Sequence, residues 1–160
     1  MRIIELKANI HVCQPEELTE TERTLIESAI KATETSYAKY SNFKVGAAAL
    51  LSGGTIVTGS NQENASYPLG LCAERTTIFA ANSQYPDQAV VTLCIAAKNE
   101  RDELLPDPIT PCGACRQVIL EEENRYGKPV KMILYGTKYV YMIDDIKDIL
   151  PLAFIEETMK

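Results

Sequence analysis

The sequence predicts an α/β fold, a three-layer α/β/α sandwich with a mixed sheet of about five strands. Helical and extended patterns alternate along the chain, and the segment AVVTLCIAA at 89–97 has the continuous apolar character of a strand buried on both faces. A chain of 160 residues with 46% hydrophobic content is also large enough for a core on both sides of a sheet. We therefore expect a single domain over 1–160, in which 1–14 is an N-terminal extension that could add an edge strand.

The first half of the chain predicts a helix followed by a hairpin. Several glutamates after Pro15 are typical of a helix N-terminus, and the helix is expected at about 16–38. The nearly continuous apolar segment 43–51, the turn at 52–54 and the extended segment 55–60 predict two paired strands. The residues that recur at helical spacing and should form the buried face of the helix are Leu25, Ile26, Ala29, Ile30, Thr33 and Tyr37.

The second half predicts two longer helices and three strands around a polar loop. In chain order these are a helix at 72–83, a strand at 89–97, a Pro-rich loop at 99–110, a helix beginning at Cys112, strands at 130–135 and 139–143, and a short helix capped by Asp144 that stops before Pro151. Cys115, Val118 and Ile119 should face inward. Cys94 is expected to be a core thiol, and the acidic run 121–123 a solvated helix face.

Composition favours a cytoplasmic protein with a small substrate. The chain has 16 basic and 22 acidic residues, a formal net charge of −6 and no Lys/Arg cluster longer than a pair, so the basic surface of a nucleic-acid binder is missing. Arg2, Glu5 and Lys7 interrupt any apolar run near the N-terminus, and no stretch approaches the ~18 apolar residues of a membrane span. We therefore expect neither nucleic acid nor a membrane as a partner.

The cysteines provide the main functional signal. The chain has five, an odd number, and in a cytosolic protein a C-x-x-C pair indicates metal or redox chemistry before a disulfide framework. Cys72 and the pair Cys112 and Cys115 supply three thiolates, and the pair is spaced to face one ion from a helix N-terminus, which also favours the thiolate. Three protein ligands leave a tetrahedral Zn²⁺ one open position, which is typical of a hydrolytic site.

Two charged residues next to the first cysteine complete this prediction. Glu74 is too close to Cys72 along a helix for both to bind the metal comfortably, but a carboxylate there could reach a water at the open position and act as general acid and base. Three thiolates outweigh the charge of one Zn²⁺. Arg75 is placed to donate hydrogen bonds to the ligand sulfurs and so to compensate their excess negative charge. A closed structural site, with His11 or Cys13 as fourth ligand, is the competing interpretation.

With these residues in place, the chain resembles the cytidine deaminase family in its small homotetrameric form. The resemblance extends over about 16–154. Its motifs are Tyr40–Gly46 (YSNFKVG), Asn61–Tyr67 (NQENASY), Cys72–Thr76 (CAERT), Pro111–Gln117 (PCGACRQ) and Leu150–Phe154 (LPLAF). Nucleotide and polynucleotide deaminases of this superfamily usually have His at the first ligand position, so Cys72 favours the nucleoside branch. The resemblance implies a cytidine deaminase-like fold, with 15–160 as the catalytic core.

The resemblance also implies roles for the residues that bind a nucleoside. Asn61 and Glu63 would clasp the ribose 3′-hydroxyl, with Glu63 accepting its hydrogen and repelling a 3′-phosphate. Phe43 would pack on the pyrimidine, and the backbone of Ala73 would contact the base edge. Without the resemblance, Phe43 would be taken for a core residue and the segment 61–64 for an ordinary polar loop.

Assembly is a further implication of the resemblance. Ala65, Tyr67 and Phe154 resemble residues that reach the pocket from neighbouring subunits, so the active sites of a homotetramer would be shared, with one Zn²⁺ per subunit. The extension at 1–14, the long loop at 99–110 and the segment Pro68-Leu69-Gly70 before the first ligand depart from the compact family pattern. The last of these could reshape the rim of the pocket.

The implied reaction is zinc-dependent hydrolysis of cytidine or deoxycytidine to the uridine product and ammonia. A deaminase of another aminopyrimidine nucleoside, such as a blasticidin-type antibiotic, is the nearest alternative, and Asn61, Glu63 and Phe154 favour cytidine over it. A non-catalytic, zinc-stabilised binding module is an alternative of a different class. Glu74 distinguishes the two classes, because a closed structural site has no use for an acid beside an open position.

Overall fold

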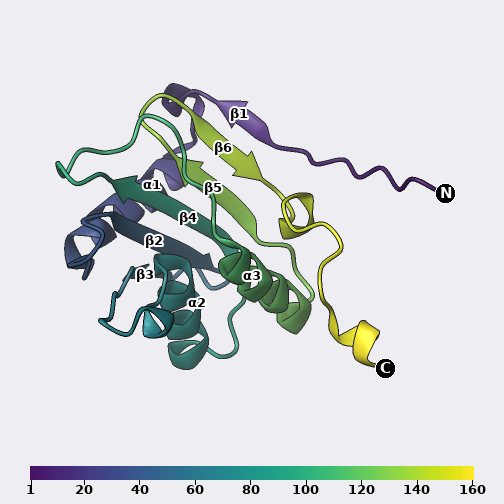
Figure 1. The fold of residues 1–160 in the computed structure, drawn as a ribbon. Coiled ribbons are helices and arrows are strands. Elements are labelled where there is room, and N and C mark those ends of the chain that lie inside the picture. Colours follow the sequence, from purple (N-terminus) through teal and green to yellow (C-terminus); the bar gives the residue numbers. More distant parts are fainter.

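The computed structural model describes residues 1–160 and contains a six-stranded mixed sheet (Figure 1). The strand order is β1-β6-β5-β4-β2-β3, in which β4 and β5 are parallel and all other neighbours are antiparallel. The strands are β1 (His11–Cys13), β2 (Lys44–Leu51), β3 (Ile56–Ser60), β4 (Val90–Lys98), β5 (Lys131–Tyr135) and β6 (Val140–Ile143). The predicted α/β fold is confirmed, and the sixth strand is β1, which pairs with β6 at the sheet edge.

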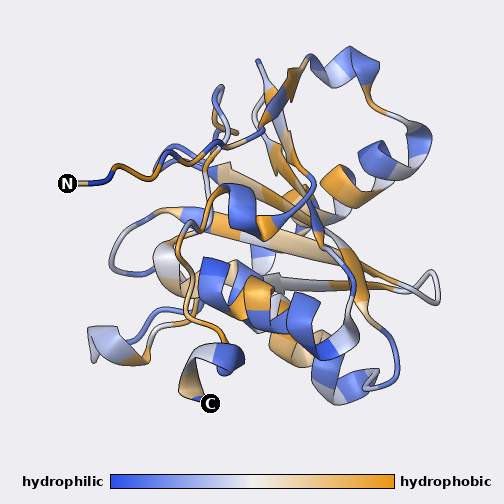
Figure 2. Ribbon diagram, turned by 90° about the vertical axis from the view of Figure 1, so that its right-hand side faces the viewer, coloured by the Kyte–Doolittle hydropathy of each residue, from blue (hydrophilic) through white to orange (hydrophobic).

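Helices cover both faces of this sheet (Figure 1). On one face, α1 (Glu20–Ala32) packs against β2 and β4, and on the other, α2 (Ala73–Gln84) and α3 (Gly113–Tyr126) lie side by side. The strands are hydrophobic through the interior, while the helices carry hydrophilic residues on their outer turns (Figure 2). The short 3-10 helices are η1 (Pro15–Glu17), η2 (Thr33–Thr35), η3 (Tyr67–Leu69), η4 (Ile146–Asp148) and η5 (Glu156–Met159).

The centre of the molecule is β4, which lies between β2 and β5. Its residues alternate between the two layers, so that Leu93 and Ile95 join the core under α2 and α3, while Cys94 and Ala96 join the core under α1. All four side chains are fully buried. The prediction of a doubly buried strand at 89–97, with Cys94 as a core thiol, is therefore confirmed.

The first helix is shorter than predicted, because capping residues divide the segment 16–38. Thr19 and Glu22 form a capping box that starts α1, after the separate turn η1. The helix ends at Ala32 and tightens into η2, where the side chains of Thr33 and Thr35 hydrogen-bond to carbonyls three residues earlier. Tyr37 therefore lies outside the helix and is half exposed, so its predicted place on the buried face was wrong.

Glycine at position 46 allows α1 to approach the sheet closely. A Cβ atom added to Gly46 in β2 would lie 2.1 Å from the carbonyl oxygen of Ala29 and 2.7 Å from the backbone nitrogen of Thr33. Both contacts are with backbone, which cannot move aside as a flexible side chain can. This close packing fixes the start of β2, and hence the segment before it, relative to α1.

The acidic run 121–123 is not the solvated helix face that the sequence suggested. Only Glu121 is exposed, whereas Glu122 and Glu123 keep 3% and 6% of their surface accessible. Glu122 accepts hydrogen bonds from the backbone N–H of Val90 and from Asn82, and Glu123 accepts them from two further backbone N–H groups. Burial raises the pKa of Glu123. The two carboxyl groups therefore connect α3 to the start of β4, to the residue before β5 and to the start of η4.

Replacement of Glu123 by Ala is expected to lower the free energy of unfolding by about 2–4 kcal/mol. The substitution leaves the backbone N–H groups of Val130 and Ile146 buried without their acceptor, and each unsatisfied group costs about 1–3 kcal/mol. Urea denaturation of Glu123→Ala measures the loss, and Glu121→Ala on the exposed side of the same helix is the matched control. Equal denaturation midpoints for the two variants would contradict this role.

The two ends of the chain lie outside the core (Figure 1). Residues 1–10 form no regular element and are exposed. The backbone N–H of Asn9 donates a hydrogen bond to the side chain of Asp148 at 3.1 Å. Near the other end, Asp145 rather than the predicted Asp144 caps the short helix η4, because its side chain accepts from the N–H of Lys147. None of the helices is both long and apolar enough to cross a membrane.

Candidate active site

The three predicted metal ligands meet between the N-termini of α2 and α3. Cys72 is the residue immediately before α2, Cys112 is the residue immediately before α3, and Cys115 lies in the first turn of α3. The Sγ atoms of Cys72 and Cys112 are 3.9 Å apart, those of Cys112 and Cys115 are 3.4 Å apart, and all three lie within 4.8 Å of one another. Neither His11 nor Cys13 joins this cluster.

This donor set fits one zinc ion. Zinc–sulfur bonds of about 2.3 Å in a tetrahedron place the sulfurs about 3.8 Å apart, which agrees with the observed spacing. Three sulfurs with no fourth protein ligand leave one coordination position for water or substrate. The exposed Cys112 lies on the open side of the cluster, whereas Cys115 is fully buried. The residues present could therefore hold a zinc ion of the catalytic type.

The cluster is electrostatically prepared for a cation. Hydrogen bonding to Cys115, and to a lesser degree to Arg75 and Cys112, lowers the pKa of the Cys72 thiol to about 5, against the opposing effect of burial. The same interaction with Cys72, together with burial, raises the pKa of Cys115. Zinc requires all three sulfurs as thiolates, so its binding must release protons from the cluster.

Arg75 lies beside the cluster, as the sequence suggested. Its Nη2 atom is 3.9 Å from the Sγ of Cys72 and 3.3 Å from the carbonyl oxygen of Gly70, to which it donates. Its Nε atom is buried and has no hydrogen-bond partner. The partly buried guanidinium therefore places its positive charge beside the sulfur of Cys72, where thiolate charge accumulates.

Replacement of Arg75 by Gln is expected to keep the fold but to weaken zinc retention roughly 10–100-fold, the range for outer-shell partners of a metal site. The loss of positive charge also disfavours release of protons at the site, so the pH midpoint of activity should rise. Competition with a chelator and a pH–activity profile measure the two effects. Arg75→Lys is the control that keeps the charge but loses the planar guanidinium. Unchanged zinc affinity and pH midpoint in Arg75→Gln would refute this role.

Glu74 supplies a buried carboxyl group next to the sulfur cluster. It lies in the first turn of α2 with 4% of its surface exposed, and it lines the same cavity as Cys72 and Cys112. Burial raises the pKa of Glu74, and the nearby charge of Cys72 acts in the same direction. A raised pKa makes a carboxyl group a stronger base, which favours the acceptance and return of a proton that a general acid and base requires.

The cavity has a volume of about 300 Å³, at the lower end of the range for small-molecule sites. Its lining combines two cysteines of the sulfur cluster, and the residues next to them, with residues from three other parts of the chain, at 41–45, 61–63 and 109–110. The lining residues are Ser41, Phe43, Val45, Asn61, Glu63, Cys72, Ala73, Glu74, Ile109, Thr110 and Cys112. Each predicted residue for the base and the ribose, namely Phe43, Ala73, Asn61 and Glu63, therefore lies at this one cavity.

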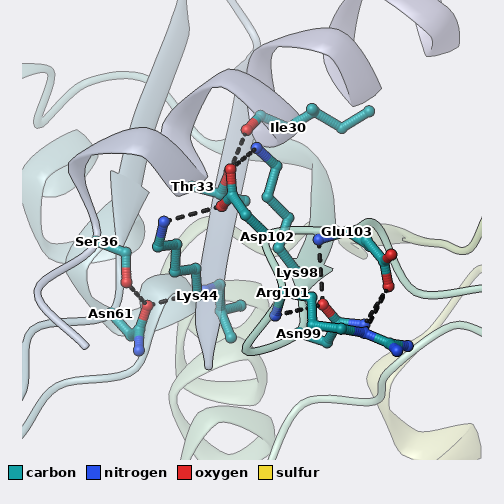
Figure 3. Close-up of polar contacts among 11 residues, drawn as sticks. Ile30, Thr33, Ser36, Lys44, Asn61, Lys98, Asn99, Arg101, Asp102 and Glu103 are labelled. Carbon is teal, nitrogen blue, oxygen red and sulfur yellow. Dashed lines mark hydrogen bonds and ion pairs between the residues drawn. The ribbon is translucent and has the colours of Figure 1, made fainter. Parts of the chain in front are cut away.

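Asn61 and Glu63 also hold the segment that carries Phe43. The side-chain oxygen of Asn61 accepts from the hydroxyl of Ser36 (Figure 3) and from the backbone N–H of Val45 at 2.8 Å. Its amide nitrogen donates to the carbonyl of Phe43 at 2.9 Å. One N–H of Asn61 remains for a ligand. Hydrogen bonds, first of all from Ser41, lower the pKa of Glu63, which therefore lines the cavity as a carboxylate.

The chemistry of this cavity agrees with a sequence family. Residues 19–126, more than half of the chain, match the model of the family described as "Cytidine and deoxycytidylate deaminase zinc-binding region". The chain belongs to the cytidine and deoxycytidylate deaminase family. All three cysteines of the cluster and Glu74 lie within the matched residues.

Relatives within this deaminase family cover most of the chain. The cytidine deaminase of Halalkalibacterium halodurans is 40% identical over 84% of this chain and 95% of its own length. The cytidine deaminase of Sporosarcina psychrophila is 39% identical over 84% of this chain and 92% of its own length. A crystal structure of cytidine deaminase from Burkholderia pseudomallei has a TM-score of 0.70 and 38% identity, covering 86% of this chain and 100% of that chain. A crystal structure of cytidine deaminase from Mycobacterium tuberculosis has a TM-score of 0.67 and 34% identity, covering 84% of this chain and 97% of that chain.

Three residues that the deaminase resemblance assigned to the substrate pocket lie outside the cavity of their own chain. Ala65 and Tyr67 are exposed on the segment before α2, and Phe154 is exposed near the C-terminus, where its carbonyl accepts from Gln117. Tyr67 and Phe154 expose 75% and 62% of their surface. Tyr67 contacts Tyr40 edge to face, with ring centroids 5.8 Å apart, and both residues line a neighbouring hollow.

The sequence did not identify the part that the loop 99–110 plays at the cavity, where it supplies Ile109 and Thr110. Asp102, in the left-handed region with φ of 62°, pairs with Lys44 at 2.8 Å and with Lys98 at 3.5 Å, which ties the loop to β2 and β4 (Figure 3). The Pro-rich composition indicated a loop, but the ion pair of Asp102 with Lys44 joins residues that are distant in the sequence.

Proposed function

We propose that this chain is a zinc-dependent hydrolase that converts cytidine, deoxycytidine or both into the corresponding uridine and ammonia. The observation that carries this proposal is the cavity at the open three-sulfur cluster, which the buried carboxyl of Glu74 lines together with Phe43, Asn61 and Glu63. Membership of the deaminase family supports it, and so do relatives named cytidine deaminase. The five free cysteines support a cytoplasmic setting, where thiols stay reduced.

Glu74 would move the protons of this reaction. Hydrolysis of the amine adds one water to the base and releases one ammonia. One group must therefore carry one proton of the water to the ring nitrogen, and later carry the proton of the added hydroxyl to the leaving amine. The position of Glu74 beside the cluster and its raised pKa support this assignment. A zinc ion held by the three sulfurs would supply an activated water as the nucleophile.

The rest of the cavity would hold a free nucleoside. The half-buried ring of Phe43 offers an apolar face for the pyrimidine, and the backbone of Ala73 lies beside Glu74 to meet the base edge. Asn61 and Glu63 would bind the ribose 3′-hydroxyl, through the remaining N–H of Asn61 and the carboxylate of Glu63. A negative charge there would repel a 3′-phosphate, which favours nucleosides over internal nucleotides.

A substrate panel tests the proposal. Loss of ultraviolet absorbance, with ammonia measured in parallel, should show turnover of cytidine or deoxycytidine and strong discrimination against cytidine 3′-monophosphate. A blasticidin-type nucleoside is the competing substrate in the same panel. Preferred turnover of that compound would replace cytidine as the substrate, and no deamination of any aminopyrimidine nucleoside by the zinc-loaded protein would contradict the proposed reaction.

Assembly would complete the site. We infer a homotetramer in which Ala65, Tyr67 and Phe154 reach the cavities of neighbouring subunits, with 15–160 as the catalytic core and 1–14 as an extension. The exposure of both aromatic side chains outside their own cavity supports this inference. Analytical ultracentrifugation combined with activity should show activity only in the assembled fraction, whereas a fully active monomer would contradict shared sites.

A further inference from the structure

The hydroxyl of Ser41 lies between two residues of the proposed substrate cavity. It donates a hydrogen bond to the Oε1 atom of Glu63, and it accepts one from the backbone N–H of Phe43 at 3.0 Å. An ionised carboxylate can only accept, so the hydroxyl hydrogen of Ser41 points to Glu63, while a lone pair of the same oxygen accepts from the N–H of Phe43. Ser41 itself lines the same cavity as Glu63.

The other oxygen of Glu63 is occupied by backbone. Its Oε2 atom accepts from the N–H of Tyr40 at 2.7 Å and from the N–H of Ser41 at 3.3 Å. The carboxylate is therefore held at both oxygens by a single short segment, and only one acceptor site on Oε1 is left for a ligand. Hydrogen bonds to an ionised acceptor are the stronger kind, and they fix the plane of the carboxylate as well as its charge.

The local backbone is shaped for this arrangement. Asn42 has a φ of 54°, in the left-handed region that Asn tolerates better than most residues, and its N–H donates to the carbonyl of Ala38 at 2.9 Å. This conformation turns the chain so that the N–H of Phe43 points back at the hydroxyl of Ser41. The same segment is fastened from the far side by Asn61, which donates to the carbonyl of Phe43.

We propose that Ser41 is a positioning residue that orients the carboxylate of Glu63 toward the ribose 3′-hydroxyl and thereby sets selectivity for that hydroxyl. This inference rests on the cytidine deaminase function proposed above and on the assignment of Glu63 to the ribose. Ser41 acts through Glu63, so its contribution should disappear when either the carboxylate or the substrate hydroxyl is absent. A purely structural role would instead affect all substrates equally.

Steady-state kinetics of cytidine and 3′-deoxycytidine test this inference. Ser41→Ala should lower kcat/KM for cytidine roughly 10-fold, mainly through a higher KM, because one hydrogen bond to a charged group is lost. The kcat/KM for 3′-deoxycytidine should change less than about 2-fold, because this substrate lacks the hydroxyl that Glu63 would bind. Ser41→Thr keeps the hydroxyl and should restore the selectivity. Ser28→Ala removes a comparable hydroxyl from α1, outside the cavity, and should leave both substrates unaffected.

The double variant Ser41→Ala/Glu63→Ala provides a second test. If Ser41 acts through Glu63, the double variant should be no worse on cytidine than Glu63→Ala alone. Equal losses on both substrates, no loss at all, or fully additive effects in the double variant would overturn the role of Ser41 while cytidine turnover by the unmodified protein persists. Absence of any turnover by the unmodified, zinc-loaded protein would instead overturn the proposed function, and the role of Ser41 with it.

Discussion

Glu74→Gln is expected to retain zinc and to lose turnover by roughly 10²–10⁴-fold, the usual contribution of a positioned general acid and base. Glu74 is not one of the clustered sulfur ligands, so its replacement removes no metal bond. The amide has nearly the shape of the carboxyl group, so the buried site at the start of α2 should keep its packing. What the amide cannot do is accept a proton and return it.

Zinc content per chain and kcat for cytidine are the two quantities to measure in Glu74→Gln. Glu34→Gln, an exposed position in η2, is the matched control and should show unchanged values for both. A Glu74→Gln protein with full zinc and near-normal kcat would remove Glu74 from the reaction. Loss of zinc together with activity would mean that the carboxyl group holds the metal.

Cys112→Ala is expected to lose zinc and activity together. The cysteine is exposed, so its replacement removes a ligand without opening a cavity in the core, unlike the same change at the fully buried Cys115. The loss of zinc affinity should exceed the roughly 10–100-fold that removal of an outer-shell partner costs, because a direct bond to the metal is gone. Two sulfurs alone would leave the ion with half of its tetrahedral ligands.

Metal analysis after dialysis against a weak chelator measures this loss. Cys13→Ala is the matched control, because Cys13 in β1 is half-buried and lies outside the sulfur cluster. It should keep zinc and turnover at the level of the unmodified protein. If Cys112→Ala still bound one zinc per chain with the original affinity, the three-sulfur site would be wrong.

The sulfur cluster and the central strand were predictable because their determinants are local. A C-x-x-C pair at a helix start brings two sulfurs to one point whatever the rest of the fold does. The apolar run of β4 likewise indicates a strand buried on both faces without knowledge of its neighbours. The sequence also predicted that Cys72 begins a helix of its own, and the packing of α2 beside α3 brings it to the pair.

The features that escaped prediction depend on partners that are distant in the sequence. Glu122 and Glu123 were taken for surface residues, since three consecutive glutamates usually face solvent. Three of their four hydrogen-bond donors are backbone N–H groups, which carry no sequence signal. The sequence likewise did not indicate a role for Ser41, because that role depends on its hydrogen bond to Glu63, which lies in another segment and contacts Ser41 only in the folded chain.

Reconstitution with zinc tests the central claim most directly. The protein would be stripped by a chelator, and the loss of cytidine absorbance would be followed while zinc is added back in known equivalents. The three-sulfur site with Glu74 as proton carrier predicts no turnover without metal, a linear rise to a plateau at one zinc per chain, and no recovery in Glu74→Gln. Turnover that survives complete removal of zinc, or equal recovery in Glu74→Gln, would contradict it.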